Sequence, residues 1–235
     1  MNSGRTLLGV GTGNFPEDMS LKERVEAVSE MGAEGIEINL GMGPGIGVME
    51  EHEVRGLRKT LEDFEFVTIH APQREDMDSE SYRKLLGDVE QIRKKLGADS
   101  VVIHPDWILD SHEFLAEFER PAVENMSFSK GFGRREFREF MAETDAEVVL
   151  DVCHSFTWHR NDLVEMYMEF GDRISHIHLS GLGDDEHEPL FRNPEILNEE
   201  VRAVVVNNRV VLESAVESVE EMEEELDFVR DWLVN

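Results

Sequence analysis

Apolar residues along the chain gather in short runs, and longer segments with a different repeat separate these runs. Eight runs are rich in Val, Ile and Leu and have the length of buried strands. They predict strands at 6–13, 33–40, 64–72, 99–105, 120–126, 147–154, 173–181 and 208–216. The intervening segments repeat their apolar residues every three or four positions, as amphipathic helices do. They predict helices at roughly 20–32, 48–62, 79–96, 111–118, 134–143, 160–170, 196–205 and 217–233.

Local signals agree with several of these boundaries. The residues at which a helix N-cap is expected are Ser20, Ser79, Ser111 and Asn161. The segments MGAEGIEI and LGADSVVI are alike, and each indicates a helix that ends at Gly shortly before a strand begins.

The order of the elements predicts the fold class. Eight strands that alternate with eight helices are typical of an α/β protein with a (β/α)8 TIM barrel, and a doubly wound sheet is the alternative. The 235 residues suit one such barrel, and no linker or low-complexity tract divides them. We therefore expect a single domain over residues 1–235.

Composition narrows the possible partners. The chain has 52 acidic and 23 basic residues, a net charge of −29, which disfavours simple electrostatic capture of nucleic acid or of an anionic membrane. Its apolar runs are too short for a membrane span, and the N-terminus lacks the apolar region of a signal peptide. We expect a cytoplasmic protein with no membrane partner, and no feature predicts a protein partner. The single cysteine, Cys153, excludes an internal disulfide and is expected to be a small buried thiol.

The segment VVLDVCHSF contains a feature that recurs along the chain. Its apolar run ends in Asp151, and His154 follows three residues later. Similar acids and histidines stand near the ends of other predicted strands or just beyond them. The complete set is His70, His104, Glu124, Asp151, His154, His178, Asp185, His187 and Glu213. Because all strands of a parallel barrel end at the same mouth, these nine side chains are expected to converge on one cavity.

The chemistry of this set predicts a metal site. Burying its four carboxylates together is very costly unless cations neutralise them. Imidazole and carboxylate together are the ligands of Zn²⁺, Mn²⁺, Fe²⁺ or Co²⁺. His176 shares a face with His178 but lies deeper, so a core or supporting position is favoured for it. The remaining histidines fall in predicted helices or loops and are expected to be solvated: His52, His112 and His159.

The strand endings VTIHAP, VVIHP, VENM, LDVCH, HIHLSG, DEH and LES, taken in order, resemble the xylose isomerase-like TIM barrel superfamily, and within it the endonuclease IV branch (family 2 AP endonucleases) most. That resemblance covers nearly the whole chain and implies up to three Zn²⁺ ions held by the nine residues named above. It implies that Glu124 bridges two zincs and a hydroxide, that His70 and His104 hold the remaining metal, and that the others complete the cluster. The implied activity is hydrolysis of a phosphodiester in abasic-site DNA or in another phosphate ester.

Some positions depart from the endonuclease pattern. Gln73 stands where the endonucleases have a Tyr that engages distorted DNA, and Ser180 and Gly181 stand where they have Asn-Asp. The chain is also shorter than the repair enzymes, and its basic residues cluster only locally, in 130–138. These departures bear on DNA recognition more than on metal binding.

The sugar isomerases and epimerases are a sister branch that the same residues also resemble. Their single divalent ion, Mn²⁺ or Mg²⁺, is held by Glu, Asp, His and Glu from late strands, and Glu124, Asp151, His178 and Glu213 would fill those places. The alternative function is therefore a single-metal sugar or sugar-phosphate isomerase or epimerase, with Glu124 and Glu213 as its acid/base pair.

Charge favours the hydrolase. Four ionised carboxylates with three Zn²⁺ leave a net positive charge that attracts phosphate, whereas one divalent ion leaves a net negative charge that suits a neutral sugar. DVCH and VENM are also closely similar to the endonuclease branch, and all nine of its ligand positions are occupied here. The resemblance therefore implies a metal-dependent hydrolase in which Glu124, Glu213 and His178 carry the chemistry. A non-catalytic barrel that only binds a metal or ligand is a third hypothesis. Glu37 faces the same mouth and either hydrogen-bonds a sugar or forms a salt bridge, and Asn125 is expected to support Glu124.

Overall fold

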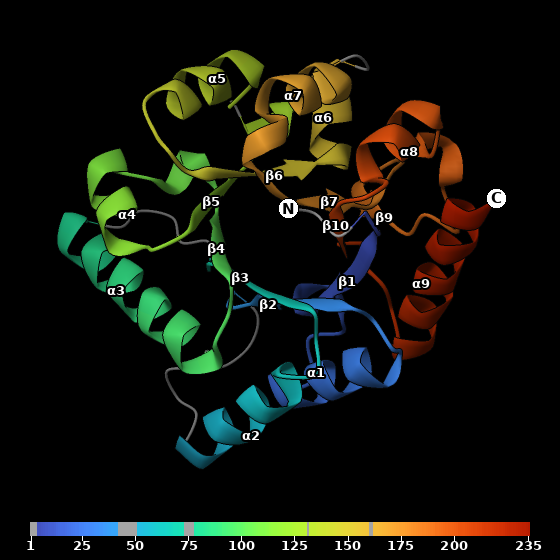
Figure 1. The fold of residues 1–235 in the computed structure, drawn as a ribbon, viewed down its shortest axis with the longest axis horizontal. Coiled ribbons are helices and arrows are strands. Elements are labelled where there is room, and N and C mark those ends of the chain that lie inside the picture. The colour runs from blue at the N-terminus through green and yellow to red at the C-terminus, as the bar shows by residue number, and fades with distance from the viewer. Residues whose placement is uncertain (1–3, 42–50, 73–77, 131, 160–161) are drawn as a thin grey trace.

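Eight parallel strands close into a barrel, and the helices form a ring around it (Figure 1). A computed structural model describes residues 4–41, 51–72, 78–130, 132–159 and 162–235. The barrel strands are β1 (Leu7–Gly11), β2 (Gly35–Asn39), β3 (Phe66–His70), β4 (Ser100–Ile103), β5 (Pro121–Glu124), β6 (Glu147–Asp151), β7 (Ile174–Leu179) and β10 (Arg209–Leu212). They are hydrogen-bonded in the order β1-β10-β7-β6-β5-β4-β3-β2, and β2 pairs with β1 to close the ring. The predicted single-domain (β/α)8 barrel is confirmed.

The helices cover the outside of the barrel in chain order. They are α1 (Leu21–Glu30), α2 (Glu51–Leu61), α3 (Ser79–Leu96), α4 (Ser111–Glu117), α5 (Arg134–Ala142), α6 (Val152–Trp158), α7 (Asp162–Phe170), α8 (Glu199–Val205) and α9 (Val219–Val234). The apolar faces of these helices pack on the outward-facing strand residues in one large core. Among the described residues, no helix combines the length and apolar character that a membrane crossing would need.

Three of the predicted boundaries are corrected by side-chain capping. The predicted strand 147–154 ends at Asp151, because the Asp151 carboxylate accepts a hydrogen bond from His154 N and starts the short helix α6 there. The caps of α3 and α4 are Asp78 and Asp110, one residue before the predicted Ser79 and Ser111, because an aspartate at each position already accepts the first free N–H groups. Ser20 caps α1 as predicted, and Asn161 lies outside the described residues.

A small hairpin, which periodicity does not predict, follows β7. It pairs β8 (Gly181–Leu182) with β9 (Glu186–Glu188) in antiparallel fashion. Gly181 permits this pairing, since a Cβ there would lie 2.7 Å from the carbonyl oxygen of Glu188. The hairpin lies beyond the carboxyl end of the strands, so it adds residues to the mouth of the barrel.

The barrel interior is layered from apolar at the bottom to polar at the mouth. Leu7, Phe66 and Val211 form one small buried cluster, in which Leu7 and Phe66 stand at the amino ends of their strands, and Val102, Ala122 and Val149 form another. Gly35 makes room for Phe66, because a Cβ at Gly35 would lie only 2.0 Å from the Phe66 ring. These layers close the barrel from below and leave the polar inward-facing residues at its mouth.

Gly35→Ala is expected to destabilise the protein, because its methyl group and the Phe66 ring cannot both keep their positions. We expect a loss of about 1–3 kcal/mol in the free energy of unfolding, measured by denaturant titration. Gly56→Ala in α2 is the matched control, since nothing lies within 4 Å of a Cβ there. That variant is expected to be neutral or more stable by about 0.5–1 kcal/mol, and an equal loss in both variants would contradict the packing argument.

Candidate metal centre

A cavity of about 340 Å³ opens at the carboxyl end of the barrel strands. Its lining comes from the strand ends, from the loops that follow them and from the β8–β9 hairpin. The described lining residues are Gly13, Asn14, Asn39, His70, His104, Glu124, Met126, Lys130, His154, Glu186, His187, Glu213 and Ala215. Most of the predicted site residues therefore lie in one place, as strand parity and parallel topology require.

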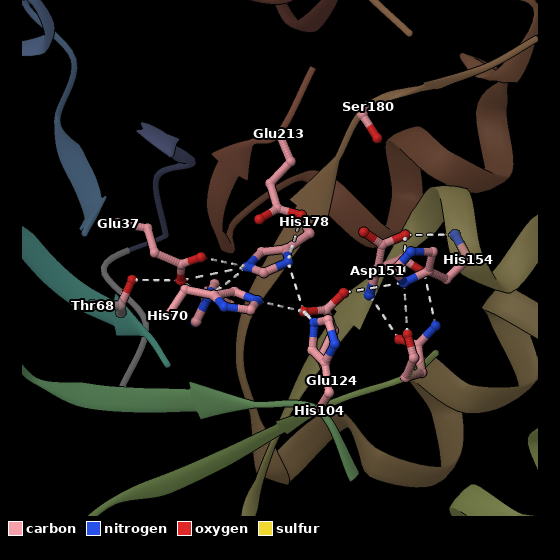
Figure 2. A network of polar contacts seen from close by, with 12 residues as sticks. Glu37, Thr68, His70, His104, Glu124, Asp151, His154, His178, Ser180 and Glu213 are labelled. Atoms are coloured by element: carbon pink, nitrogen blue, oxygen red, sulfur yellow. Dashed lines mark hydrogen bonds and ion pairs between the residues drawn. The ribbon is translucent and has the colours of Figure 1, made fainter. Parts of the chain in front are cut away.

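Glu124, at the end of β5, lies at the centre of the cluster (Figure 2). Its side chain is buried, and four imidazoles surround it. The distances from its carboxylate oxygens are 3.2 Å to His70 Nε2, 3.3 Å to His104 Nε2, 3.1 Å to His154 Nδ1 and 3.5 Å to His178 Nδ1. One carboxylate thus joins residues from β3, from the position directly after β4, from α6 and from β7.

Charge within the cluster shifts its protonation equilibria. Burial acts to raise the pKa of Glu124, but the positive charges of His178 and His104 outweigh it and hold that pKa well below its ordinary value. Burial acts to lower the pKa of His70, but Glu124 and Glu37 raise it to about 9. His154 follows the same pattern, since Asp151 and Glu124 overcome its burial and raise its pKa to about 10. In the absence of metal, protons on these imidazoles neutralise the carboxylates.

The described side chains form five overlapping donor sets of the size that a metal ion needs. Two of them include Glu37, either with His176 and His178 or with His70 and Glu213, and the other three consist entirely of predicted site residues. In each set the candidate ligand atoms lie within 4.8 Å of one another. Of those three, the first set is His70, His104 and Glu124, the second is Glu124, Asp151, His178 and Glu213, and the third is Asp151, His154 and His187. Glu124 belongs to the first two sets and Asp151 to the last two, so the three sets form one continuous cluster.

Two buried atoms of the second set support a cation at this site. Asp151 Oδ2 and His178 Nδ1 are buried and have no hydrogen-bond partner of normal geometry in the part of the chain that the structure describes. His178 Nδ1 nevertheless lies 2.9 Å from Glu213 Oε2. A neutral imidazole lone pair and a carboxylate oxygen repel each other at this distance, so a proton or a metal ion is required between them. The residues therefore fit a divalent cation.

Hydrogen bonds outside the cluster orient its histidines. His70 Nδ1 contacts the carbonyl of Ala71 at 3.0 Å, and His154 Nδ1 contacts the carbonyl of Asn125 at 2.9 Å. Since a carbonyl can only accept, both Nδ1 atoms carry hydrogen and both Nε2 atoms are available to a cation. Such contacts fix the ring and tautomer of metal-binding histidines.

Asn125 stabilises the carboxyl end of the neighbouring strand, β6. Its side-chain oxygen accepts from Asp151 N at 2.7 Å, and its amide nitrogen donates to the Asp151 carbonyl at 3.0 Å. The sequence predicts support of Glu124, but these hydrogen bonds hold β6 and Asp151. Asn125 thereby fixes the residue that the second and third donor sets share.

The hairpin brings His187 to the cluster. His187 has a backbone φ of 64°, an uncommon conformation for a residue other than glycine. Its Nε2 lies 3.2 Å from His154 Nε2, and its Nδ1 lies 3.1 Å from Ser180 Oγ. The sequence analysis treats Ser180 only as a departure from the endonuclease pattern, yet its hydroxyl orients His187. The position of Ser180, two residues after the predicted ligand His178, is the sequence feature that could have indicated this role.

Asp185 is the one predicted ligand that this structure places away from the cluster. Its side chain is exposed, and among the described residues it belongs to none of the donor sets. The Glu188 carboxylate accepts from the backbone N–H groups of Asp184 and Asp185, which fixes the hairpin turn with Asp185 outward. Glu186 lines the cavity instead and lies 4.0 Å from His154 Nε2. Sequence reasoning missed Glu186 because the register shifts within the hairpin.

The other polar residues named from the sequence lie outside the cavity lining. Glu37 is buried between His176, His178 and Thr68, and it belongs to the two donor sets that it forms with His176 and His178 and with His70 and Glu213. Burial raises the pKa of Cys153, which therefore stays a thiol and belongs to none of the donor sets found among the described residues. The three histidines predicted to be solvated are exposed: His52, His112 and His159. Gln73 lies outside the described residues.

Comparison with known proteins agrees with this geometry. Residues 25–232 match the xylose isomerase-like TIM barrel family. The chain belongs to this family. The match confirms the predicted superfamily, and the catalytic centres of such barrels lie at the same mouth as this cluster. No curated protein sequence matches the chain.

Solved structures with this fold include enzymes of both branches. A D-tagatose 3-epimerase-like protein superposes with a TM-score of 0.72 at 17% identity, covering 97% of both chains. The 3-keto-D-glucoside 4-epimerase of E. coli gives 0.68 at 14% identity, covering 97% of this chain and 100% of the other. A family 2 AP endonuclease from Brucella melitensis gives 0.65 at 14% identity, covering 95% and 99%. At these identities the likeness establishes the fold alone.

Metal binding to the metal-free protein is expected to release protons. His70 and His154, with pKa values of about 9 and 10, are protonated at pH 7.5, and a bound ion must displace those protons. These raised values stabilise the metal-free fold below the unfolded-state pKa, and the contribution is lost as the pH rises toward 9 and 10. Apparent zinc affinity should therefore increase with pH up to about pH 10.

The check is calorimetric titration of chelator-treated protein with Zn²⁺ in two buffers of different ionisation enthalpy. We expect release of about two or more protons per chain at pH 7.5, and fewer near pH 10. His154→Ala serves as the comparison and should release about one proton fewer. Binding with no proton release at pH 7.5 would contradict this account of the metal-free charges.

Proposed function

We propose that the protein is a multinuclear metal-dependent hydrolase that acts on a phosphate ester, with Zn²⁺ as its metal. The observation that supports this most strongly is the continuity of the three donor sets through Glu124 and Asp151. A single ion would use only the set of Glu124, Asp151, His178 and Glu213. The remaining imidazoles would then surround carboxylates without binding a metal.

Charge supports the same proposal. The three donor sets joined through Glu124 and Asp151 contain three carboxylates, Glu124, Asp151 and Glu213, and Glu37 adds a fourth in the two sets that include it. Three divalent ions would bring six positive charges, and the surplus would attract a phosphate group. A single divalent ion would leave a net negative charge, which suits a neutral sugar better.

The exposure of each carboxylate indicates its role in the proposed reaction. Divalent ions, when bound, neutralise the phosphate oxygens and lower the pKa of water. Glu124 is buried and has both carboxylate oxygens beside imidazoles, so its role is to hold the ions. Glu213 is partly exposed to the cavity, and His178 contributes to lowering its pKa despite burial, so it is ionised and can accept a proton from the attacking water. His178 orients Glu213 through the 2.9 Å contact.

A sugar isomerase or epimerase is the alternative function. The observation in its favour is that the second donor set alone provides four ligands, one from the carboxyl end of each of β5, β6, β7 and β10. Epimerases are also among the structures with this fold. In that case Glu124 and Glu213 would exchange a carbon-bound proton of the sugar.

His154→Ala distinguishes the two functions, because only the multinuclear site needs the third donor set. For the hydrolase we expect about two to three Zn²⁺ per chain by elemental analysis. The variant should lose one of these ions and about 100-fold or more of its hydrolytic rate on abasic-site DNA or a small phosphodiester. One ion per chain in both proteins, together with solvent-deuterium exchange into a sugar that Glu213→Gln abolishes, would establish the epimerase instead.

Lys130 is expected to bind the phosphate group of the substrate. Among the described residues that line the cavity, it is the only lysine or arginine. Lys130→Ala should raise KM for a phosphate-ester substrate by about tenfold with little change in kcat, and Lys130→Arg should restore most of the affinity. Lys95→Ala, which removes the same charge from the exposed end of α3, is the control. An equal effect of both substitutions would mean that only net charge matters.

A further inference from the structure

A second layer of polar residues lies inside the barrel directly below the metal centre. Glu37 on β2 accepts a hydrogen bond from Thr68 Oγ1 on β3 at 2.8 Å. The same carboxylate oxygen lies 3.1 Å from His176 Nε2 on β7. All three side chains are buried, with Glu37 exposed by only 1%. Figure 2 shows Glu37 and Thr68 on the side of His178 that faces away from Glu124.

A carboxylate in this position needs a specific explanation. A neighbouring cluster of inward-facing side chains, Val102, Ala122 and Val149, is apolar. Burying a carboxylate among such residues costs several kcal/mol unless hydrogen bonds compensate for the lost water. Among the described residues, the partners of Glu37 are a threonine and two histidines, and no lysine or arginine pairs with it. The buried position of Glu37 is therefore explained by its contacts with the histidines rather than by a contribution to the stability of the barrel.

His178 connects Glu37 to the metal centre. Its Nε2 lies 3.3 Å from Glu37 Oε1, and its Nδ1 lies 2.9 Å from Glu213 Oε2 on the opposite side of the ring. A neutral imidazole carries one hydrogen. If that hydrogen is on Nε2, toward Glu37, the lone pair of Nδ1 faces Glu124 and Glu213 and is available to a cation.

We propose that Glu37 is a positioning residue that holds His178 in the Nε2–H tautomer and thereby makes Nδ1 a metal ligand. Thr68 and His176 in turn hold Glu37. The other histidines of the site support this assignment, because His70 and His154 are oriented by carbonyl oxygens in the same way. A carboxylate is the stronger acceptor, so it also makes the His178 ligand more basic. The proposal rests on the metal-binding part of the proposed function and applies equally to one ion or to three.

The test compares Glu37→Leu, which removes the acceptor, with Glu37→Gln, which keeps one acceptor oxygen. Zinc affinity is measured by competition with a chromogenic chelator, which requires no substrate. The ring nitrogens of His178 are observed by ¹⁵N NMR of the zinc-loaded proteins. We expect Glu37→Leu to weaken one bound zinc by about 10- to 100-fold and to disturb the Nε2–H signal of His178, with Glu37→Gln intermediate.

Glu90→Gln is the matched control for general destabilisation. Glu90 is also a buried glutamate, but it pairs with Arg93 outside the barrel. This variant should lose stability without losing zinc affinity. If Glu37→Leu does not fold, Glu37→Gln decides, with a loss of several-fold supporting the proposal.

Two results would overturn the proposal. One is zinc affinity and a His178 spectrum that both remain unchanged in the Glu37 variants. The other is loss of a whole zinc equivalent with the His178 tautomer unchanged, which would make Glu37, His176 and His178 a metal site of their own. If only the proposed hydrolase activity is wrong, the results differ from both of these. The protein would still bind zinc, and the Glu37 variants would still weaken that zinc binding.

Discussion

The structure of the barrel mouth depends on the interaction of one buried carboxylate with four imidazoles. Glu124 cannot remain ionised inside an apolar barrel without positive charge beside it. His70 on β3, His154 on α6 and His178 on β7 supply that charge, and His104, directly after β4, contacts the same carboxylate. Any cation that enters must therefore replace protons that already stabilise the fold, so metal affinity and folding stability respond to the same equilibria.

The apolar layers below the mouth make this interaction stronger. Phe66 fills the bottom of the barrel because Gly35 leaves space for its ring, and Val102, Ala122 and Val149 also exclude water. In this environment the charges are screened only from the open side. Glu37 is a charged residue beside these apolar layers. Its contact with His178 connects the packed interior to the candidate metal centre.

Strand positions could be predicted from the sequence because each buried strand is an apolar run, and parity places every second residue inside. His70, Glu124, Asp151 and His178 were predicted in this way, and Glu213 follows directly after β10. Residues outside the strands could not be placed by parity. His154 lies on a helix because Asp151 caps that helix, and Glu186 faces the cavity while Asp185 does not because the hairpin shifts its register. Capping and hairpin register depend on contacts in three dimensions, which periodicity does not contain.

The four residues Glu124, Asp151, His178 and Glu213 could serve two chemistries, and use of the outer imidazoles would decide between them. A cation held by these four residues alone would leave Glu124 and Glu213 able to exchange protons with a sugar. Cations held also by His70 and His104 and by His154 and His187 would engage Glu124 more fully, and it could then no longer exchange a proton. The positive charge that results favours a phosphate group instead. The hairpin that brings His187 within 3.2 Å of His154 therefore matters as much for the reaction type as the strand-end carboxylates do.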